Sequence, residues 1–314
     1  MAKLTIKDIA RLCGVGKSTV SRVLNHDPNV SAQTRQRVEQ IIRQYQFHPS
    51  KSARSMRGVN SRTIGIIVSR LSSASENQAL AAMLPLLYAN QCEPIIVESR
   101  FNPAMVQEHL NFFTQRAVDG VILFAFSELN EDSLTGWKEK MVVIARHYPT
   151  LSSVYYDDEK AIGLLMQHLY AQGHRHIAYL GVQDCDLTTG YRRHQSYQQF
   201  CQTHQLTPHS VQGELGYLWA YQHTGAVISP QISALVCATD SQALGAIKYL
   251  QENRLQQIQV CSVGNNPLLQ FLFPNILMAE LGFTQAGEIA VTQLLALLEG
   301  KPIQHYCVDC TLAE

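Results

Sequence analysis

The sequence predicts an all-α helix-turn-helix domain at the N-terminus, followed by a two-lobed α/β domain with doubly wound sheets. Charge divides the chain first: residues 1–60 hold 11 Lys and Arg against three acids, and the remaining 14 basic and 22 acidic residues leave residues 61–314 with a net −8. Apolar residues recur at helical spacing in the first part, whereas from Thr63 onward continuous apolar strands alternate with helices. A length of 314 residues suits two such domains.

The composition argues against a secreted or membrane-bound protein. The longest apolar runs have the length of single strands, and the N-terminus lacks the apolar core of a secretion signal. Eight cysteines are too few for a disulfide framework in a chain of this length, and they fit a reducing compartment. We therefore expect a cytoplasmic protein with no membrane partner.

The basic N-terminal part fits three short helices. Thr5 can cap the first helix, and the side chain of Asp8, three residues later, can accept a hydrogen bond from the Thr5 main-chain N–H, as in a capping box. Glycines within residues 14–16 break this helix, a second helix follows over residues 17–25, and a third over about residues 31–45 closes a small core. Two short helices around a glycine turn form a helix-turn-helix, whose second helix presents side chains to a DNA major groove.

The positive charge indicates a polyanionic partner, although a merely solvated basic face has the same composition. Lys17 and Arg22 suit the O6 and N7 atoms of guanine, and Ser18 suits a base or a phosphate. Residues 16–19 also look like the end of a phosphate-binding loop, but Arg11 replaces the first glycine of that motif and a helix precedes it, so we reject nucleotide binding. The expected contacts to double-stranded DNA here are Thr5, Lys17, Ser18, Thr19, Ser21, Arg22, Asn25 and Ser31.

A short basic segment, residues 49–58, connects the two parts and contains almost no core-forming residues. Such a segment is marginal as an isolated helix, so its folding can be coupled to DNA binding. Arg54 and Arg57 would then contact phosphates and Met56 would insert into a minor-groove step, with Ala53 also at the interface. The alternative is an ordinary interdomain linker.

These residues carry a resemblance to a known family. The run from residue 4 to residue 25, from Leu-Thr-Ile-Lys-Asp to Val-Leu-Asn, resembles the N-terminal signature of the LacI/GalR family of repressors. Ser-Ala-Arg-Ser-Met, ending at Met56, resembles the hinge helix of that family, in which most members have leucine at the last position. The resemblance implies a homodimer that pairs two N-terminal domains and two hinge helices on a pseudo-palindromic operator.

The acidic part contains seven apolar strand-like runs, in two groups separated near residue 158. They cover residues 63–69, 93–98, 119–124 and 141–145, then 177–181, 234–238 and 260–264, with helical stretches expected over 76–91, 103–116 and 131–139. Two such lobes resemble the periplasmic-binding-protein-like effector domain of the family. We expect residues 1–60 to form the DNA-binding domain with its hinge, lobe 1 to comprise about residues 61–157 and 284–303, and lobe 2 to comprise about 158–283 and 304–314.

Polar residues follow the strands, where open α/β sheets bind their ligands. Arg70, Arg100 and Arg146 follow three strands of lobe 1, and one of Arg192 and Arg193 can face the cleft from lobe 2. Aspartate, asparagine and threonine residues after the lobe 2 strands suit sugar hydroxyls, whereas several arginines suit a phosphate. A sugar phosphate satisfies both demands.

Each of these residues has an alternative structural role. Arg70 and Arg146 could be salt-bridged scaffold residues, and Arg100 could pair with Glu98 or Glu108. Asp240 could be a helix N-cap, and Phe283 could pack in the core instead of stacking on a sugar.

The strings at residues 67–77, 145–146, 188–194 and 237–241 resemble the trehalose-responsive branch of the family. The resemblance implies trehalose 6-phosphate as the effector, although a related repressor for another sugar or sugar phosphate is the alternative. The effector contacts that we expect are Arg70, Arg146, Asp186, Leu187, Thr188, Thr189, Arg193, Asp240, Ser241 and Phe283.

Catalytic and metal-binding motifs are weak. Cys307 and Cys310 form a lone CxxC pair on an expected terminal strand, and two further ligands for zinc are missing. No nucleophile with an adjacent base stands out, and the common hydrolase and dinucleotide-binding motifs are missing from the sequence. We therefore expect no cofactor, no metal and no enzymatic activity. The resemblance implies a transcriptional repressor of trehalose uptake or utilisation genes.

Overall fold

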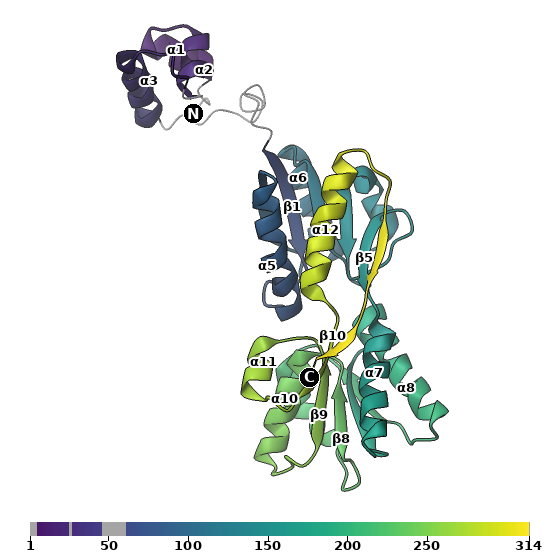
Figure 1. Cartoon of the computed structure of the whole chain (residues 1–314). Helices are drawn as coiled ribbons and strands as arrows, with labels where there is room; N and C mark the ends of the chain where they lie inside the picture. Colours follow the sequence, from purple (N-terminus) through teal and green to yellow (C-terminus); the bar gives the residue numbers. More distant parts are fainter. Residues whose placement is uncertain (1–4, 25–26, 46–60, 314) are drawn as a thin grey trace. The chain divides into compact units, whose positions relative to one another are not determined.

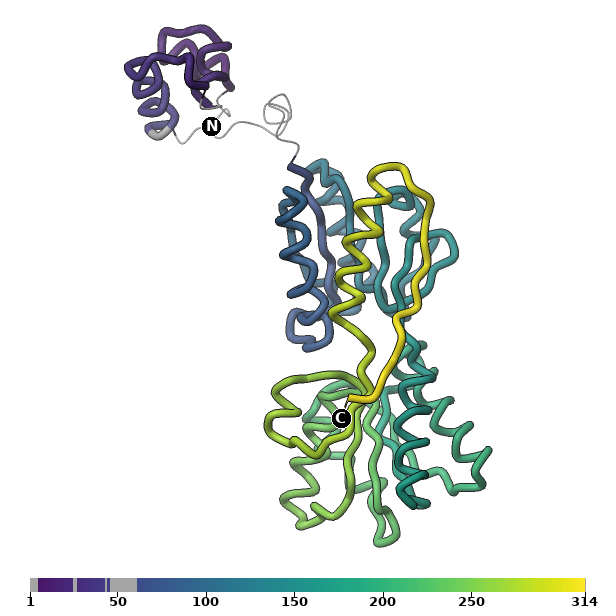
Figure 2. The backbone as a smooth tube through the Cα atoms, in the orientation of Figure 1, coloured from purple at the N-terminus to yellow at the C-terminus, as the bar shows by residue number. Residues whose placement is uncertain are grey.

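A computed structural model describes residues 5–24, 27–45 and 61–313 (Figures 1 and 2). The chain divides into two compact units, Met1–Ser61 and Arg62–Glu314. Five of the expected DNA contacts lie outside the described residues: Asn25, Ala53, Arg54, Met56 and Arg57. The expected hinge helix also lies outside them.

The N-terminal unit contains the three expected helices, α1 (Ile6–Cys13), α2 (Lys17–Leu24) and α3 (Ala32–Gln44). The Thr5 main-chain N–H donates to the Asp8 carboxylate at 2.9 Å, and the Asp8 main-chain N–H donates back to the Thr5 hydroxyl at 3.4 Å. Gly14 ends α1 in the left-handed conformation, with φ of 63°, which glycine adopts without steric cost. The buried side chains that hold the three helices together are Ile9, Cys13, Val20, Val23 and Val38. This arrangement is a helix-turn-helix.

Lobe 1 of the second unit is a six-stranded parallel sheet in the order β11-β5-β4-β3-β1-β2. Two helices, α5 (Ala74–Ala89) and α12 (Phe283–Leu298), cover one face of this sheet, and α6 (Pro103–Gln115) covers the other (Figure 1). A 3₁₀-helix, η1 (Glu131–Lys140), lies beside α6 on the second face. The strands are β1 (Arg62–Val68), β2 (Cys92–Glu98), β3 (Gly120–Phe124), β4 (Met141–Ile144), β5 (Ser152–Tyr156) and β11 (His305–Val308).

Lobe 2 repeats this design with the sheet order β12-β10-β9-β8-β6-β7, in which only β12 is antiparallel to its neighbour. Its strands are β6 (Ile177–Val182), β7 (His209–Gly213), β8 (Ala234–Cys237), β9 (Gln259–Val263), β10 (Leu277–Glu280) and β12 (Thr311–Ala313). Its helices are α7 (Asp158–Ala171), the π-helix η2 (Leu187–Arg192), α8 (Arg193–Thr203), α9 (Tyr217–His223), η3 (Thr224–Ala226), α10 (Asp240–Glu252) and α11 (Pro267–Leu272). The predicted doubly wound, two-lobed fold is therefore confirmed.

The chain passes three times between the lobes (Figure 2). The first passage runs through Asp157, the second through Leu281 and Gly282, and the third through Asp309 and Cys310. The assignment of residues 304–314 to lobe 2 is wrong for β11, which pairs in parallel with β5 and completes the sheet of lobe 1. The error has a physical cause: three of the four β11 side chains are exposed on an edge strand, so the sequence has no apolar pattern that assigns it to either sheet.

Within the ranges 5–24, 27–45 and 61–313, no helix is both long enough and apolar enough to cross a membrane.

Candidate functional site

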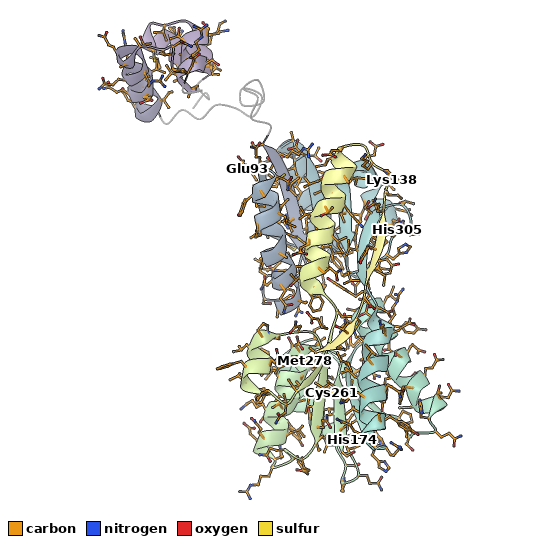
Figure 3. All side chains as sticks on the ribbon, in the orientation of Figure 1. Glu93, Lys138, His174, Cys261, Met278 and His305 are labelled. Atoms are coloured by element: carbon orange, nitrogen blue, oxygen red, sulfur yellow. The ribbon has the colours of Figure 1, made fainter. Side chains whose placement is uncertain are left out.

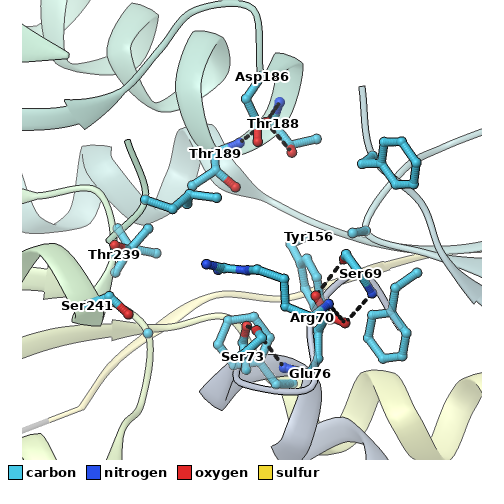
Figure 4. Close-up of a pocket in the computed structure, with 18 of the residues that line it drawn as sticks. Ser69, Arg70, Ser73, Glu76, Tyr156, Asp186, Thr188, Thr189, Thr239 and Ser241 are labelled. Atoms are coloured by element: carbon cyan, nitrogen blue, oxygen red, sulfur yellow. Dashed lines mark hydrogen bonds between the residues drawn. The ribbon is translucent and has the colours of Figure 1, made fainter. Parts of the chain in front are cut away.

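A cleft opens between the two lobes at the carboxyl ends of both sheets (Figure 4). The space between its lining atoms, including the part open to solvent, is about 1030 Å³. Eight of the ten expected effector contacts line this cleft: Arg70, Asp186, Thr188, Thr189, Arg193, Asp240, Ser241 and Phe283.

Arg70 follows β1 and extends across the cleft towards lobe 2, where Thr189, Thr239 and Ser241 lie (Figure 4). Its guanidinium carbon lies 5.4 Å from the centre of the Phe101 ring. Its Nε atom is buried and has no hydrogen-bond partner among the described residues. No described carboxylate forms an ion pair with Arg70, so the alternative of a salt-bridged scaffold arginine has no support here.

Glu76 is a cleft residue that the sequence analysis missed. Its carboxylate is buried and accepts hydrogen bonds from the main-chain N–H of Ser69 at 2.7 Å and from the Ser69 hydroxyl at 2.6 Å. Burial raises the pKa of the Glu76 carboxyl, against the opposing effect of these donors. The sequence Ser73-x-x-Glu76 indicates only a capping box at the start of α5, and Ser73 does cap the helix, but the glutamate side chain bonds to Ser69 instead.

Arg193 and Asp158 form a buried ion pair on the cleft wall. The Arg193 Nη2 atom lies 2.6 Å from the Asp158 Oδ1 atom, and the side chains are 7% and 2% exposed. Arg193 also donates to the main-chain carbonyl of Ala238. Burial raises the pKa of Asp158, and the positive charge of Arg193 opposes this shift. Arg193 therefore faces the cleft, whereas Arg192 is exposed and lines a smaller adjoining pocket.

Asp240 is not the N-cap of α10, because that position belongs to Thr239, whose side chain accepts from the Gln242 main-chain N–H. The Asp240 carboxylate instead accepts from the Ser262 hydroxyl at 2.8 Å and from the main-chain N–H groups of Asn265 and Asn266. Burial raises the pKa of Asp240 to about 6. Asp240 thus lines the cleft while its carboxylate holds the loop after β9 by hydrogen bonds.

The turn after β6 is held by Asp186. Its Oδ1 atom accepts from the main-chain N–H groups of Thr188 and Thr189, each at 3.0 Å, and from the Thr188 hydroxyl. Position 190 requires glycine, because an added Cβ would stand 2.0 Å from the carbonyl oxygen of Gln183. This packing fixes both threonines at the edge of the cleft.

Two expected effector residues lie beside the cleft instead of on its wall. The Arg146 Nη1 atom donates to the carbonyl oxygens of Phe126 at 3.1 Å and Ser127 at 3.0 Å. Arg146 and Leu187 line the smaller adjoining pocket, together with Thr188 and Arg192.

Contacts settle the alternative for Arg100, whereas Phe283 fits both of its alternatives. Arg100 pairs with Glu98 at 2.8 Å and does not line the cleft. Phe283 packs edge-to-face on Tyr156, with ring centres 5.2 Å apart, and it also lines the cleft.

In the N-terminal unit, the α2 side chains that are predicted to contact DNA bases are exposed. Lys17, Ser18 and Arg22 are exposed, and the Arg22 Nε atom lies 3.8 Å from Asp27. Thr19 and Ser21 are half-buried, and Thr5 and Ser31 cap α1 and α3.

The remaining histidine and cysteine motifs do not form a site within the described part of the chain. His174 lies at the end of lobe 2 far from the cleft (Figure 3) and contacts Ser233 at 2.8 Å and Gln259 at 3.0 Å. No group of three or more His, Cys, Asp or Glu residues there could hold a metal ion. Cys307 and Cys310 are free cysteines.

Comparisons with known proteins agree with this architecture. Residues 5–50 match the family described as bacterial regulatory proteins, lacI family, and residues 166–313 match a periplasmic binding protein-like domain. The HTH-type transcriptional regulator TreR of Escherichia coli K12 is 50% identical over 312 residues, 99% of each chain, and TreR of Salmonella typhimurium is 50% identical over 299 residues, 95% of each chain.

Solved structures show the same relationship. The trehalose repressor from Escherichia coli has a TM-score of 0.80 at 45% identity and covers 81% of this chain and 100% of its own. The lac repressor dimer bound to operator and the anti-inducer ONPF has a TM-score of 0.79 at 22% identity, covers 100% of this chain and 98% of its own, and so shares the fold. Because its similarity to transcriptional regulators extends over nearly the whole sequence, the chain belongs to the lacI family of bacterial regulatory proteins.

Proposed function

We propose that the chain is a cytoplasmic transcriptional repressor of trehalose uptake or utilisation genes, released from its operator when trehalose 6-phosphate binds between the lobes. The observation that carries the proposal is the buried, unpartnered Nε atom of Arg70 in a cleft otherwise rich in oxygen atoms. The names of the two TreR relatives and of the trehalose repressor from Escherichia coli support the choice of sugar.

The phosphate assignment follows from the charges in the cleft. Arg193 is already neutralised by Asp158, so it has little positive charge left for a ligand. Arg70 has no carboxylate within ion-pair distance among the described residues, although its charge interacts with that of the buried Glu76 carboxylate. Its buried Nε atom has no hydrogen-bond partner there, which costs free energy until something binds it. A guanidinium group binds phosphate oxygens with two parallel hydrogen bonds, which suits Arg70 to a phosphate ester.

The sugar assignment follows from the other side chains on the wall. Asp240, Ser241 and Thr189 offer carboxylate and hydroxyl oxygens from lobe 2, and Glu76 offers a carboxylate from lobe 1. Sugar hydroxyls donate to carboxylates and exchange hydrogen bonds with hydroxyl groups. Phe283 and Phe101 supply apolar surface for the carbon faces of the rings. A phosphorylated disaccharide uses all three kinds of surface.

The DNA side of the proposal rests on α2. Its exposed Lys17, Ser18 and Arg22 would read bases in the major groove of double-stranded operator DNA, while other basic residues contact phosphates. Effector binding would then lower operator affinity through a coupling free energy, which is typically about 1–3 kcal/mol.

A homodimer is part of the proposal, because lobe 2 exposes several large apolar side chains on α9 and α11. Tyr217 is 62%, Leu268 63% and Phe271 82% exposed. Large exposed apolar side chains are typical of protein interfaces, and a second copy of the chain would bury these three. Phe271→Glu is expected to shift the sedimentation coefficient of the chain to that of a monomer, and an unchanged value would exclude α11 from the dimer interface.

Thermal unfolding of the full chain with a panel of ligands tests the proposal. A ligand that binds the folded state raises the melting temperature, and the rise grows with the logarithm of the ratio of its free concentration to its Kd. Trehalose 6-phosphate should give the largest rise, ahead of trehalose, glucose 6-phosphate and sucrose 6-phosphate at equal concentration. A larger rise with another sugar phosphate would assign the chain to a different sugar, and conversion of trehalose 6-phosphate to a product would contradict a purely regulatory role.

A further inference from the structure

Two hydrogen bonds join the lobes directly, beside the cleft. The main-chain N–H of Leu187, in lobe 2, donates to the hydroxyl of Ser127, in lobe 1, at 2.7 Å. The side-chain amide of Gln78, on α5 of lobe 1, donates to the main-chain carbonyl of Asn265, in lobe 2, at 2.5 Å. In both bonds a lobe 1 side chain holds a main-chain group of lobe 2.

Both bonds attach to segments of lobe 2 that are hydrogen-bonded to a cleft carboxylate. Leu187 follows Asp186, whose carboxylate holds the turn after β6. Asn265 donates its main-chain N–H to Asp240 while its carbonyl accepts from Gln78. The two contacts therefore hold lobe 2 at two separate loops, one after β6 and one after β9.

Neither lobe 1 side chain lines the cleft, and the segment that presents Ser127 is held by a neighbouring arginine. The carbonyl of Ser127 accepts from Arg146, which also holds the carbonyl of Phe126. Gln78 stands two residues after Glu76 on the same helix. Arg146 thus braces the segment that presents the Ser127 hydroxyl, a role separate from contact with a ligand.

We infer that Gln78 and Ser127 are positioning residues that hold the lobes closed before the effector arrives. The inference rests on the proposed function for the identity of the effector, but the two bonds act in its absence. Losing one neutral hydrogen bond should lower the ratio of closed to open lobes about fivefold. Apparent effector affinity should fall with the closed fraction, because only closed lobes present both walls of the site.

Amide hydrogen exchange in the full chain without effector tests this inference. Exchange of a protected amide follows the equilibrium by which its hydrogen bond opens. Ser127→Ala is read at the side-chain amide of Gln78, which donates to the Asn265 carbonyl. Gln78→Ala is read at the main-chain amide of Leu187, which donates to the Ser127 hydroxyl, so each substitution is measured at the opposite contact. Ser127→Thr, which keeps the hydroxyl, and Glu128→Ala, an exposed neighbour, serve as matched controls.

Each alanine variant should speed exchange at the opposite contact about fivefold, and saturating trehalose 6-phosphate should restore wild-type protection. Acceleration confined to the amide beside the substituted residue, or no acceleration at all, would overturn the inference. If wild-type protein does not bind trehalose 6-phosphate, the proposed effector is wrong, and the effector-free exchange rates still decide whether the lobes are held closed. If Gln78→Ala does not fold, Gln78→Glu gives the same test. Glutamate has nearly the same shape as glutamine, but its ionised carboxylate cannot donate a hydrogen bond to the Asn265 carbonyl.

Discussion

Arg193 and Asp158 form an ion pair almost sealed from solvent at the wall of the cleft, 2.6 Å apart, although neither residue is near the other in sequence. Asp158 begins α7 directly after the first passage between the lobes, and Arg193 begins α8. The pair therefore fixes two helices of lobe 2 together beside the hinge. This placement explains why Arg193 reaches the cleft without offering a free positive charge to it.

Removing one member of this pair should destabilise the fold. Arg193→Met leaves the Asp158 carboxylate buried without its partner, which typically costs about 3–5 kcal/mol. Denaturant unfolding of the effector domain measures this loss. The double variant Arg193→Met with Asp158→Leu should recover most of the stability, and equal stabilities of wild type and Arg193→Met would show that the pair is not structural.

Arg70 should separate phosphorylated from unphosphorylated ligands. Arg70→Ala is expected to weaken trehalose 6-phosphate binding by about 1.5–3 kcal/mol, the usual contribution of a hydrogen bond to a charged group, with a much smaller effect on trehalose. Isothermal titration calorimetry gives both values. Arg100→Ala is the matched control, because that exposed arginine pairs with Glu98 away from the cleft. Equal losses for both ligands would refute the phosphate assignment.

Stability should depend on pH through Asp240. Its pKa is about 6 in the folded chain against an ordinary value of 3.8, so the folded state binds this proton more tightly than the unfolded state. The protonated carboxyl therefore stabilises the fold fully below the unfolded pKa, and this stabilisation is lost as the pH rises through about 6.

Asp240→Asn removes this titration. On lowering the pH from 7.5 to 4, wild type should gain at most about 3 kcal/mol in unfolding free energy relative to the variant. Denaturant unfolding of both proteins at several pH values measures the difference. Parallel curves for the two proteins would exclude Asp240 as the titrating group.

Arg22 should contribute to the discrimination between base sequences without changing the affinity for the effector. A good bidentate contact to a base contributes about 1–3 kcal/mol of discrimination, so Arg22→Ala should bind operator and scrambled DNA with more similar affinities. Fluorescence anisotropy with the two duplexes measures this ratio, and calorimetry should find effector affinity unchanged. Arg11→Ala, on the exposed face of α1, controls for the loss of one positive charge. A uniform loss on both duplexes would make Arg22 a phosphate contact.

Local sequence signals were sufficient for the N-terminal unit and for most strands. The Thr5 and Asp8 capping box, the glycine turn and the apolar periodicity all act over a few residues, so they can be interpreted without tertiary structure. The buried strands of both lobes appear as continuous apolar runs for the same reason. Four shorter strands, β5, β7, β10 and β12, have more mixed patterns and were not predicted.

The contacts that complete the cleft depend on residues brought together from distant positions. Asp158 pairs with Arg193 across 35 positions in the sequence, and Gln78 meets Asn265 across 187 positions. No local pattern indicates such partners. Arg146 shows the same limit, because its position after β4 fits a ligand contact, yet its guanidinium group binds the carbonyls of the segment after β3.

The most direct measurement is a titration of trehalose 6-phosphate into the complex of the full chain with its operator, followed by fluorescence anisotropy of labelled DNA. Release of the DNA is expected at concentrations that saturate the cleft, while Arg70→Ala keeps its operator affinity and loses the release. An anisotropy that stays constant while calorimetry shows the ligand bound would contradict the coupling between the cleft and the DNA-binding unit.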